Sequence, residues 1–398
     1  MSITITNNLS KINTAYNPIY IRPASTNTAN YGFKFVFDLY VSGVFVNRVK
    51  LLPRPLSTNT LYSPARVLET YVTYDLTNQI ITSGLTTNSF KQYEVKIGEE
   101  YGSALTGTTV YSGLTTVSGY TFNGVLQYDE IPTWDYLDYI AASGGTSSFL
   151  TNSPASKLIK VTERETMAII FSGITAAVLD AFITVTAYKL AGGVTTQQES
   201  IYSTVSGLTG PLIIGTGPWN VNQWLLTDID PAIHYKYTVN IGFTDVSTDY
   251  IVSEIKTYIL DSQCGKYDST RFMFLNSLGQ FDYFTAKLFN KKSIDINRTT
   301  YKKNLAYNYV VGDRGTTVIN VKASESHTVT SDWIDTDTSQ WLTELFLSPE
   351  VYILDEAGVI IPVIIDNNSI DVKRTDNEKL INYTFNYSMA NEINTARG

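Results

Sequence analysis

Paired carboxylates are the residues of this sequence whose spacing best suits acid–base chemistry. They occur as Glu163/Glu165, Asp228/Asp230, Asp135/Asp138 and Asp332/Asp335/Asp337. Residues i and i+2 of a strand share a face about 7 Å apart, a spacing that glycosidase carboxyl groups use. The Glu163/Glu165 pair would then serve a depolymerase or glycosidase with a cleft between two facing carboxyls. Most of these acids, however, fit helix starts or turns, where carboxylates have structural roles.

Histidine and cysteine offer few other catalytic groups. His327 lies in a polar strand-like segment, where we expect an exposed side chain, and His234 follows an Asp-Pro turn at the entry to a strand. Cys264 is the sole cysteine, which excludes an internal disulfide and a multi-cysteine metal site. No stretch matches a calcium loop or a phosphate-binding loop. We therefore expect no catalytic residue, no cofactor and no metal, and we do not expect an enzyme.

The segment most suited to ligand binding contains two tryptophans among side-chain amides. Tryptophan rings stack on sugar faces, and amides hydrogen-bond sugar hydroxyls. The candidate glycan-binding residues are Trp219, Asn220, Asn222 and Trp224. The competing interpretation is that both tryptophans close the end of a hydrophobic core, since tryptophan is usually largely buried.

The composition excludes several classes of function. The chain has 398 residues, of which 43% are hydrophobic and 17% charged, so it folds into several cores. Its net charge of −8 disfavours sequence-specific nucleic-acid binding, which needs a basic surface. The first residues lack a basic stretch followed by an apolar one, and no apolar run reaches the roughly 18 residues of a membrane span. We expect no signal peptide, no membrane insertion and synthesis in a cytoplasm.

The elements that would position these side chains are mostly strands. Thr, Tyr, Val, Ile and Phe dominate the sequence. Residues 1–30 are polar and contain two X-Pro steps, which predicts an extended N-terminal arm without its own core. Alternating large side chains predict a hairpin over 31–51, with a turn at Ser42-Gly43 and a short helix after Ser63-Pro64. Short strands follow at 90–97, 108–112 and 120–126, up to a boundary near residue 155.

The middle and C-terminal segments differ in pattern. Short apolar runs at regular spacing, with alternating large and polar residues at 179–187 and 235–243, predict a two-sheet sandwich over 156–296. A predicted hairpin around the turn Asn276–Gly279 either closes this sandwich or leads into the next domain. From 297 onward we expect a strand at 317–322, one helix over 332–347 with a capping box that begins at Asp337, and a hairpin across 355–358. The predicted fold is therefore mainly β and multidomain, with domains 31–155, 156–296 and 297–398 after the arm. In it a central β-sandwich is flanked by small sheet-plus-one-helix domains.

Several aromatic and glycine-containing phrases resemble virion structural proteins of tailed bacteriophages, of the kind found in phages of Bacteroidota-type hosts. The phrases that carry the resemblance are FKFVFDLY at 33–40, RVKLLP at 48–53, YEVKIGEEY at 93–101, CGKY at 264–267, RFMFLNSLGQFD at 271–282, WLTELFLSPEVY at 341–352 and IPVI at 361–364. The order of domains is similar in outline to distal-tail or baseplate-hub ring proteins.

The resemblance implies a subunit of a closed ring in the tail, baseplate or neck of a virion. Its partners would be copies of itself and other virion structural proteins, and its location the virion. An acidic balance suits a conduit for DNA, because a basic lumen would hold the phosphates. An adhesin whose sandwich binds a host glycan through Trp219 and Trp224 is the alternative, and a glycosidase using Glu163/Glu165 is a third.

Overall fold

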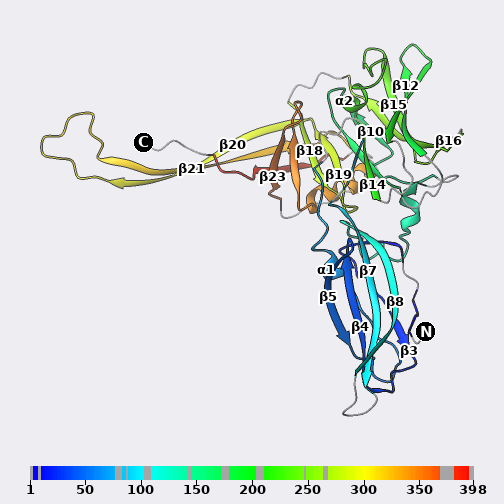
Figure 1. The fold of residues 1–398 in the computed structure, drawn as a ribbon. Helices are drawn as coiled ribbons and strands as arrows, with labels where there is room; N and C mark the ends of the chain where they lie inside the picture. The colour runs from blue at the N-terminus through cyan, green and yellow to red at the C-terminus, as the bar shows by residue number, and fades with distance from the viewer. Residues whose placement is uncertain are drawn as a thin grey trace. The chain divides into compact units, whose positions relative to one another are not determined.

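The computed structural model describes residues 3–393 except 8–9, 77–82, 87, 103–108, 142–145, 172–178, 203–209, 246–247, 263–267 and 368–380. Strands make up 53% of the chain and helices 7%, which confirms the mainly-β prediction. The chain forms two compact units (Figure 1). Unit 1 comprises 1–151, 155–260 and 276–281, and unit 2 comprises 152–154, 261–275 and 282–398. The four-part division expected above stays a prediction.

The N-terminal part of unit 1 is a five-stranded sheet, drawn in blue and cyan in Figure 1. Its strand order is β2-β8-β7-β4-β5. The strands are β2 (Ile12–Thr14), β4 (Tyr31–Val41), β5 (Val44–Leu51), β7 (Phe90–Gly102) and β8 (Thr109–Phe122). The predicted β4–β5 hairpin is confirmed, and its turn residues Ser42 and Gly43 both have positive φ, at 50° and 79°.

One face of this sheet carries its hydrophobic core. The alternating side chains of β4 from Phe33 to Val41 lie in this core, as predicted. The helix α1 (Ala65–Leu68), the strand β1 (Ile3–Ile5), which pairs with β3 (Pro23–Ser25), and the residues Ile19 and Ile21 add buried side chains to it. The N-terminal segment, expected to lack its own core, therefore packs on the chain's own sheet. The buried Glu99 carboxylate accepts hydrogen bonds from Ser25 and Asn27 at 2.6 and 2.9 Å.

The rest of unit 1 contains two sheets that share one core, which is the β-sandwich-like arrangement predicted for this segment. The six-stranded sheet has the order β10-β17-β15-β12-β13, with β16 paired to β15, and the four-stranded sheet has the order β6-β14-β11-β9. Their strands are β6 (Ser83–Leu85), β9 (Ile140–Ala141), β10 (Ser156–Ile159), β11 (Thr166–Phe171), β12 (Leu179–Lys189), β13 (Val194–Tyr202), β14 (Gly210–Gly215), β15 (His234–Asp245), β16 (Thr248–Ile251) and β17 (Lys256–Leu260).

The smaller of these sheets is buried on both faces. Ile169 and Leu212 face the core shared with the larger sheet, whereas Ala168 and Ile213 face a second core. A strand covered on both sides is hydrophobic at successive positions, which explains the apolar run Met167–Phe171. The first of these cores contains Met167, which lies two residues after Glu165, and Val221, which lies between the two tryptophans in the sequence.

Unit 2 is built on one seven-stranded sheet of order β19-β18-β22-β23-β24-β21-β20. Its strands are β18 (Thr270–Leu275), β19 (Phe281–Ala286), β20 (Phe289–Lys302), β21 (Thr316–Thr330), β22 (Val351–Leu354), β23 (Ile360–Ile365) and β24 (Thr384–Met389). The predicted hairpin around Asn276–Gly279 is present as β18 and β19, although its turn belongs to unit 1.

The predicted helix over 332–347 is two short helices, α3 (Thr336–Trp341) and α4 (Thr343–Leu347). The first is capped by Asp335, which accepts a 2.8 Å hydrogen bond from the Thr338 amide, and not by Asp337 as the sequence suggested. Trp341 packs on this unit's core and donates a 2.8 Å hydrogen bond to Asp282. The expectation of a single helix capped by Asp337 is therefore wrong.

Candidate functional site: an exposed β ribbon

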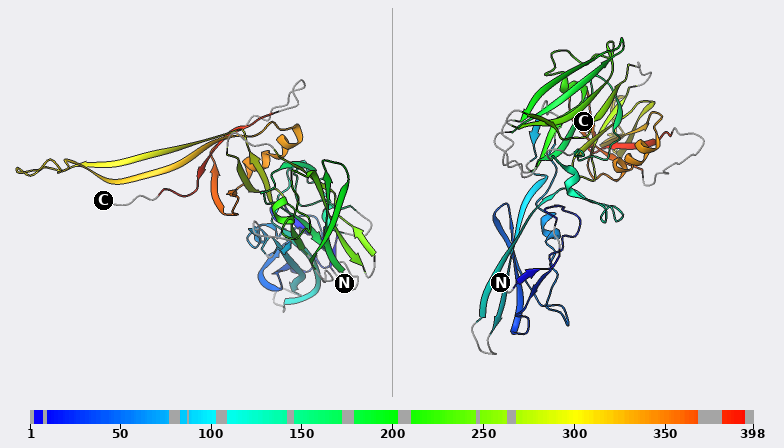
Figure 2. Two further views of the ribbon diagram at one scale, coloured as in Figure 1. Left: turned by 90° about the horizontal axis from the view of Figure 1, so that it is seen from above. Right: turned by 90° about the vertical axis from the view of Figure 1, so that its right-hand side faces the viewer.

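Strands β20 and β21 leave the sheet of unit 2 as a long two-stranded ribbon, drawn in yellow in Figures 1 and 2. They pair from Phe289 opposite Thr330 to Lys302 opposite Thr316, with a register shift at Thr299/Thr300. Elsewhere β21 pairs with β24 only over Ser326–Thr330, and one isolated bridge joins Ala323 to Ile393. Among the described residues, most of the ribbon therefore has no third strand paired to either of its edges.

The ribbon exposes apolar side chains along its length and at its end. Ile294 and Ile296 lie on one face, because alternate residues of a strand point the same way. The exposed apolar residues are Ile294, Ile296, Tyr301, Leu305, Tyr307, Tyr309, Val310, Val311, Val318 and Ile319. Tyr307 and Val311 are fully exposed. A shallow groove of about 450 Å³ lies beside the middle of the ribbon, lined in part by Asp295, Lys322 and Glu392.

The ribbon is basic, whereas the rest of the chain is acidic. Residues 289–330 contain seven Lys and Arg residues against three Asp and Glu residues. The remaining residues contain 22 basic and 34 acidic side chains. The ribbon therefore combines exposed apolar groups with a charge opposite to that of the whole molecule, a combination typical of an interaction surface.

A polar cluster anchors the root of the ribbon. Glu325 on β21 contacts the Lys292 ammonium group at 2.6 Å and His327 Nε2 at 2.8 Å. These hydrogen bonds, Lys292 first, lower the pKa of the Glu325 carboxyl. His327 also lies 3.2 Å from Asn290 and stacks on Tyr387, with ring centroids 4.8 Å apart. The expectation of an exposed His327 is wrong, since its side chain is only 10% exposed.

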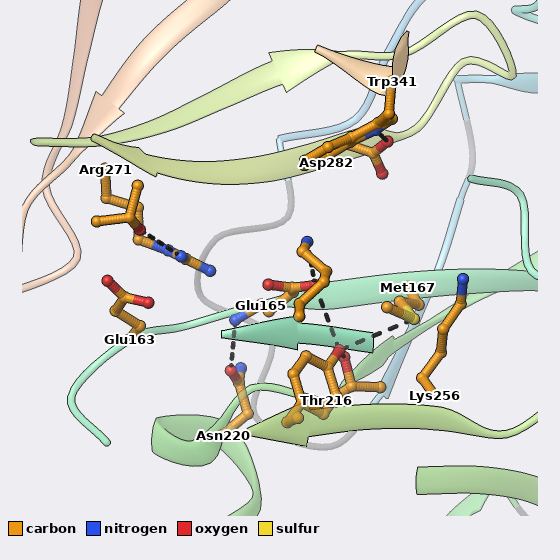
Figure 3. A network of polar contacts seen from close by, with 12 residues as sticks. Glu163, Glu165, Met167, Thr216, Asn220, Lys256, Arg271, Asp282 and Trp341 are labelled. Atoms are coloured by element: carbon orange, nitrogen blue, oxygen red, sulfur yellow. Dashed lines mark hydrogen bonds and ion pairs between the residues drawn. The ribbon is translucent and has the colours of Figure 1, made fainter. Parts of the chain in front are cut away.

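The acidic pair Glu163/Glu165 is buried and does not lie on a strand. Both residues precede β11, and Figure 3 shows Glu165 among Asn220, Thr216 and Met167. Glu165 forms a 2.7 Å ion pair with Lys157, and its backbone amide donates a hydrogen bond to Asn220. The Glu163 carboxylate accepts a 3.2 Å hydrogen bond from the Lys160 amide, so both carboxylates have internal partners in a packed interior.

Tyr258 extends the same buried network. Its hydroxyl lies 2.8 Å from the Thr216 hydroxyl and 3.3 Å from Glu165. Burial, followed by the negative charge of Glu165, raises the pKa of Tyr258 well above its usual value. Tyr237 donates a 2.9 Å hydrogen bond to the Thr216 carbonyl and stacks on Tyr258. The network joins both sheets of the sandwich, and its buried contacts indicate a structural role.

The four glycan-binding candidates lie around helix α2 (Pro218–Val221). Asn220 is completely buried, and its carbonyl oxygen accepts the Glu165 amide at 3.0 Å. Asn222 uses both ends of its amide on the Ile229 backbone, at 2.7 and 3.1 Å. The two side-chain amides that the sequence suggested for glycan binding therefore form hydrogen bonds with the main chain.

The two tryptophans have different surroundings. The Arg164 guanidinium lies 3.6 Å from the centroid of the Trp219 ring and covers one ring face. Trp224 packs against the sandwich core, and its indole nitrogen is buried without a hydrogen-bond partner among the described atoms. The position of Trp224 agrees with the competing interpretation, in which a tryptophan closes the end of the core, whereas Trp219 contacts Arg164.

Of the remaining candidates, His234 and Asp230 lie together before β15, where the Asp230 amide donates a 3.4 Å hydrogen bond to His234 Nδ1. His234 begins β15 as predicted, and it is buried. Asp230 and Asp135 accept backbone amides within their own turns. Cys264 lies outside the described residues. No group of three or more His, Cys, Asp or Glu side chains suited to a metal ion occurs in the part of the chain that the structure describes.

Sequence reasoning missed the ribbon. Most residues of β20 are polar, so no sustained apolar pattern marked that strand, and for β21 the sequence predicted only a strand over 317–322 and a strand-like segment around His327. The available signal was the cluster of seven basic residues around the turn-forming Gly312 and Gly315.

None of the helices described here is long and apolar enough to cross a membrane. No protein-family model matches the sequence. A search of curated proteins likewise returns no match. The fold, the ribbon and the charge distribution are therefore the observations on which a function rests.

Proposed function

We propose that this chain is a structural subunit of a tailed-phage virion, which forms a homo-oligomeric ring in the tail, baseplate or neck and contacts other virion proteins. The exposed β20–β21 ribbon is the observation that supports assembly. The virion itself is supported by the resemblance of the aromatic phrases at 33–40 and 271–282.

The physical argument starts from the stability of an isolated ribbon. A two-stranded hairpin in water is at best marginally stable, and three or more strands or a packed face are needed for stability. Here Tyr307, Val310 and Val311 are exposed at the end of such a hairpin. A neighbouring subunit would bury these side chains and pair the open strand edges, as in other cases of strand addition.

Passage of DNA is the second part of the proposal, and it constrains the placement of the ribbon. An acidic or neutral bore lets phosphates slide, whereas a basic one retains them. Residues 289–330 carry a net charge of +4, so in the proposed ring they face neighbouring proteins and not the bore. A ring whose bore is lined by Lys302, Lys303 and Arg314 would contradict this part of the proposal.

The experiment is native mass spectrometry of the purified chain over a range of concentrations, followed by negative-stain imaging. We expect discrete multiples of 44.3 kDa and ring-shaped particles. A chain that stays monomeric at every concentration, both alone and in a lysate of phage-infected cells, would contradict the proposal.

A further inference from the structure

Unit 1 contains an exposed acidic segment, residues 125–138, which we call the acidic loop. It contains four carboxylates and no basic residue. Its exposed apolar side chains are Val125, Tyr128, Ile131 and Leu137. Tyr128 is 92% exposed, which is unusual for an aromatic side chain in an ordered segment.

The acidic loop is held in place by its own hydrogen bonds. Glu130 accepts the Gln127 amide at 2.7 Å, and Asp135 accepts the Leu137 amide at 3.0 Å. The Trp134 ring stacks near Tyr139, and it also contacts Phe122 on β8. A surface fixed in this way loses little conformational entropy when a partner binds.

The end of the ribbon has the opposite chemistry. Residues 302–315, which we call the ribbon tip, carry Lys302, Lys303 and Arg314 against the single acid Asp313. The tip also exposes Leu305, Tyr307, Tyr309, Val310 and Val311. Both surfaces therefore combine aromatic and aliphatic side chains with charges, and the charges have opposite sign.

From this complementarity we infer that the ribbon tip of one copy docks on the acidic loop of a second copy of this chain. The apolar side chains of the two surfaces pack together, while the basic groups meet the carboxylates at the rim. This inference rests on the proposed function, since it names the contact that holds the ring together.

Such a contact is heterologous, because it joins two different surfaces of the same chain. Repeated around an axis, a heterologous contact closes into a ring, and without closure it produces a filament. It also accounts for the exposure of both surfaces in a single copy. The contact should weaken as salt is raised, because the Debye length is only about 8 Å at physiological ionic strength.

The test is a charge exchange. In the tip variant, Lys302→Glu, Lys303→Glu and Arg314→Glu are combined. In the loop variant, Asp129→Lys and Asp138→Lys are combined; Glu130 and Asp135 stay, because they hold the loop together. We expect each variant alone to weaken self-association at least about tenfold in sedimentation experiments, and an equimolar mixture of the two variants to recover part of it.

The matched control combines Lys11→Glu, Lys34→Glu and Arg54→Glu, which change the net charge equally at exposed positions of unit 1. We expect this control to assemble like the original chain. If the tip variant still forms rings of unchanged stability, the inference is overturned while the proposed function stands. If the original chain forms no oligomer, both fail.

A cross-linking experiment identifies the partner of the ribbon tip directly. A photoreactive amino acid in place of Tyr307, in a mixture of heavy- and light-isotope chains, should give mixed-isotope cross-links to residues 125–138. Cross-links within one isotope only would show that the tip reaches its own chain, and the inference would fail. Flotation of the protein with anionic phospholipid vesicles, abolished by the tip variant, would identify a membrane as the occupant and would likewise overturn it.

Discussion

The Glu165 carboxylate is almost completely buried beside the Lys157 ammonium group. Removing one partner of a buried ion pair leaves an uncompensated charge in a medium of low dielectric constant, which costs several kcal/mol. The pair therefore matters for the stability of the sandwich. Its partners and burial support a structural role in place of the acid–base role that its spacing with Glu163 suggested.

Replacement of Lys157 by methionine should lower the free energy of unfolding of unit 1 by about 3 kcal/mol. Addition of Glu165→Gln should recover part of the loss, because the remaining carboxamide carries no charge. Urea denaturation followed by circular dichroism measures both. The control Lys50→Met breaks the exposed pair with Glu100 and should cost less than about 1 kcal/mol. Equal effects of Lys157→Met and Lys50→Met would contradict the argument.

Tyr62 makes the N-terminal sheet sensitive to alkali. Burial raises its pKa from 10 to about 12. Between pH 10 and 12 the unfolded chain loses this proton and the folded chain keeps it, so stability present below pH 10 is lost as the pH rises. Tyr62→Phe should reduce this loss.

At neutral pH, Tyr62→Phe should change stability by less than about 1 kcal/mol, because the Tyr62 hydroxyl has no hydrogen-bond partner among the described atoms. Unfolding curves recorded from pH 8 to 12 test the prediction, with the exposed Tyr128→Phe as control. An identical pH slope for both variants would rule it out.

At the scale of elements, the turn between β18 and β19 requires glycine. Gly279 has φ +74°, and an added Cβ would lie 1.7 Å from the Asn123 carbonyl oxygen. Gly279→Ala should therefore destabilise unit 1 by at least about 2 kcal/mol, through the positive φ and the clash. Gly192→Ala, with φ +88° in open space, isolates the cost of the backbone conformation and should be milder. Thermal unfolding compares them, and equal losses would show that the clash relaxes freely.

The elements that the sequence predicted correctly have a pattern tied to one buried face. The β4–β5 hairpin alternates large and polar residues, and β12 and β15 alternate in the same way. Where a strand had no such alternation of large and polar residues, its predicted bounds were wrong. Residues 109–112 and 120–122 of the predicted short strands 108–112 and 120–126 belong to one strand, β8, whose threonine and glycine residues resembled turns.

The candidate site was harder to predict than the fold. The glycan-binding residues were chosen by residue type, and the main-chain partners of Asn220 and Asn222 depend on tertiary contacts that a sequence does not display. The ribbon depends on β20 continuing beyond its sheet, and strand length in a polar segment has no periodic apolar signal.

For the whole molecule, assembly and folding should be separable. Deletion of 297–322, with Ile296 and Ala323 joined by Asn-Gly, leaves a two-residue hairpin loop at a paired position. We expect the free energy of unfolding to change by less than about 1 kcal/mol, since the removed residues are almost all exposed, while self-association is lost. Sedimentation and thermal unfolding measure the two effects. A shortened chain that still forms rings, or one that fails to fold, would contradict this separation.

The pairing of β21 with β24 also sets how the ribbon transmits force. Antiparallel ladder hydrogen bonds run perpendicular to their strands. A pull on the ribbon along its length therefore shears the pairs from Ser326–Ser388 to Thr330–Thr384 together, instead of peeling them one by one. Because the load is shared, the root of the ribbon is mechanically strong in this direction, and the same ribbon pulled sideways would yield at far lower force.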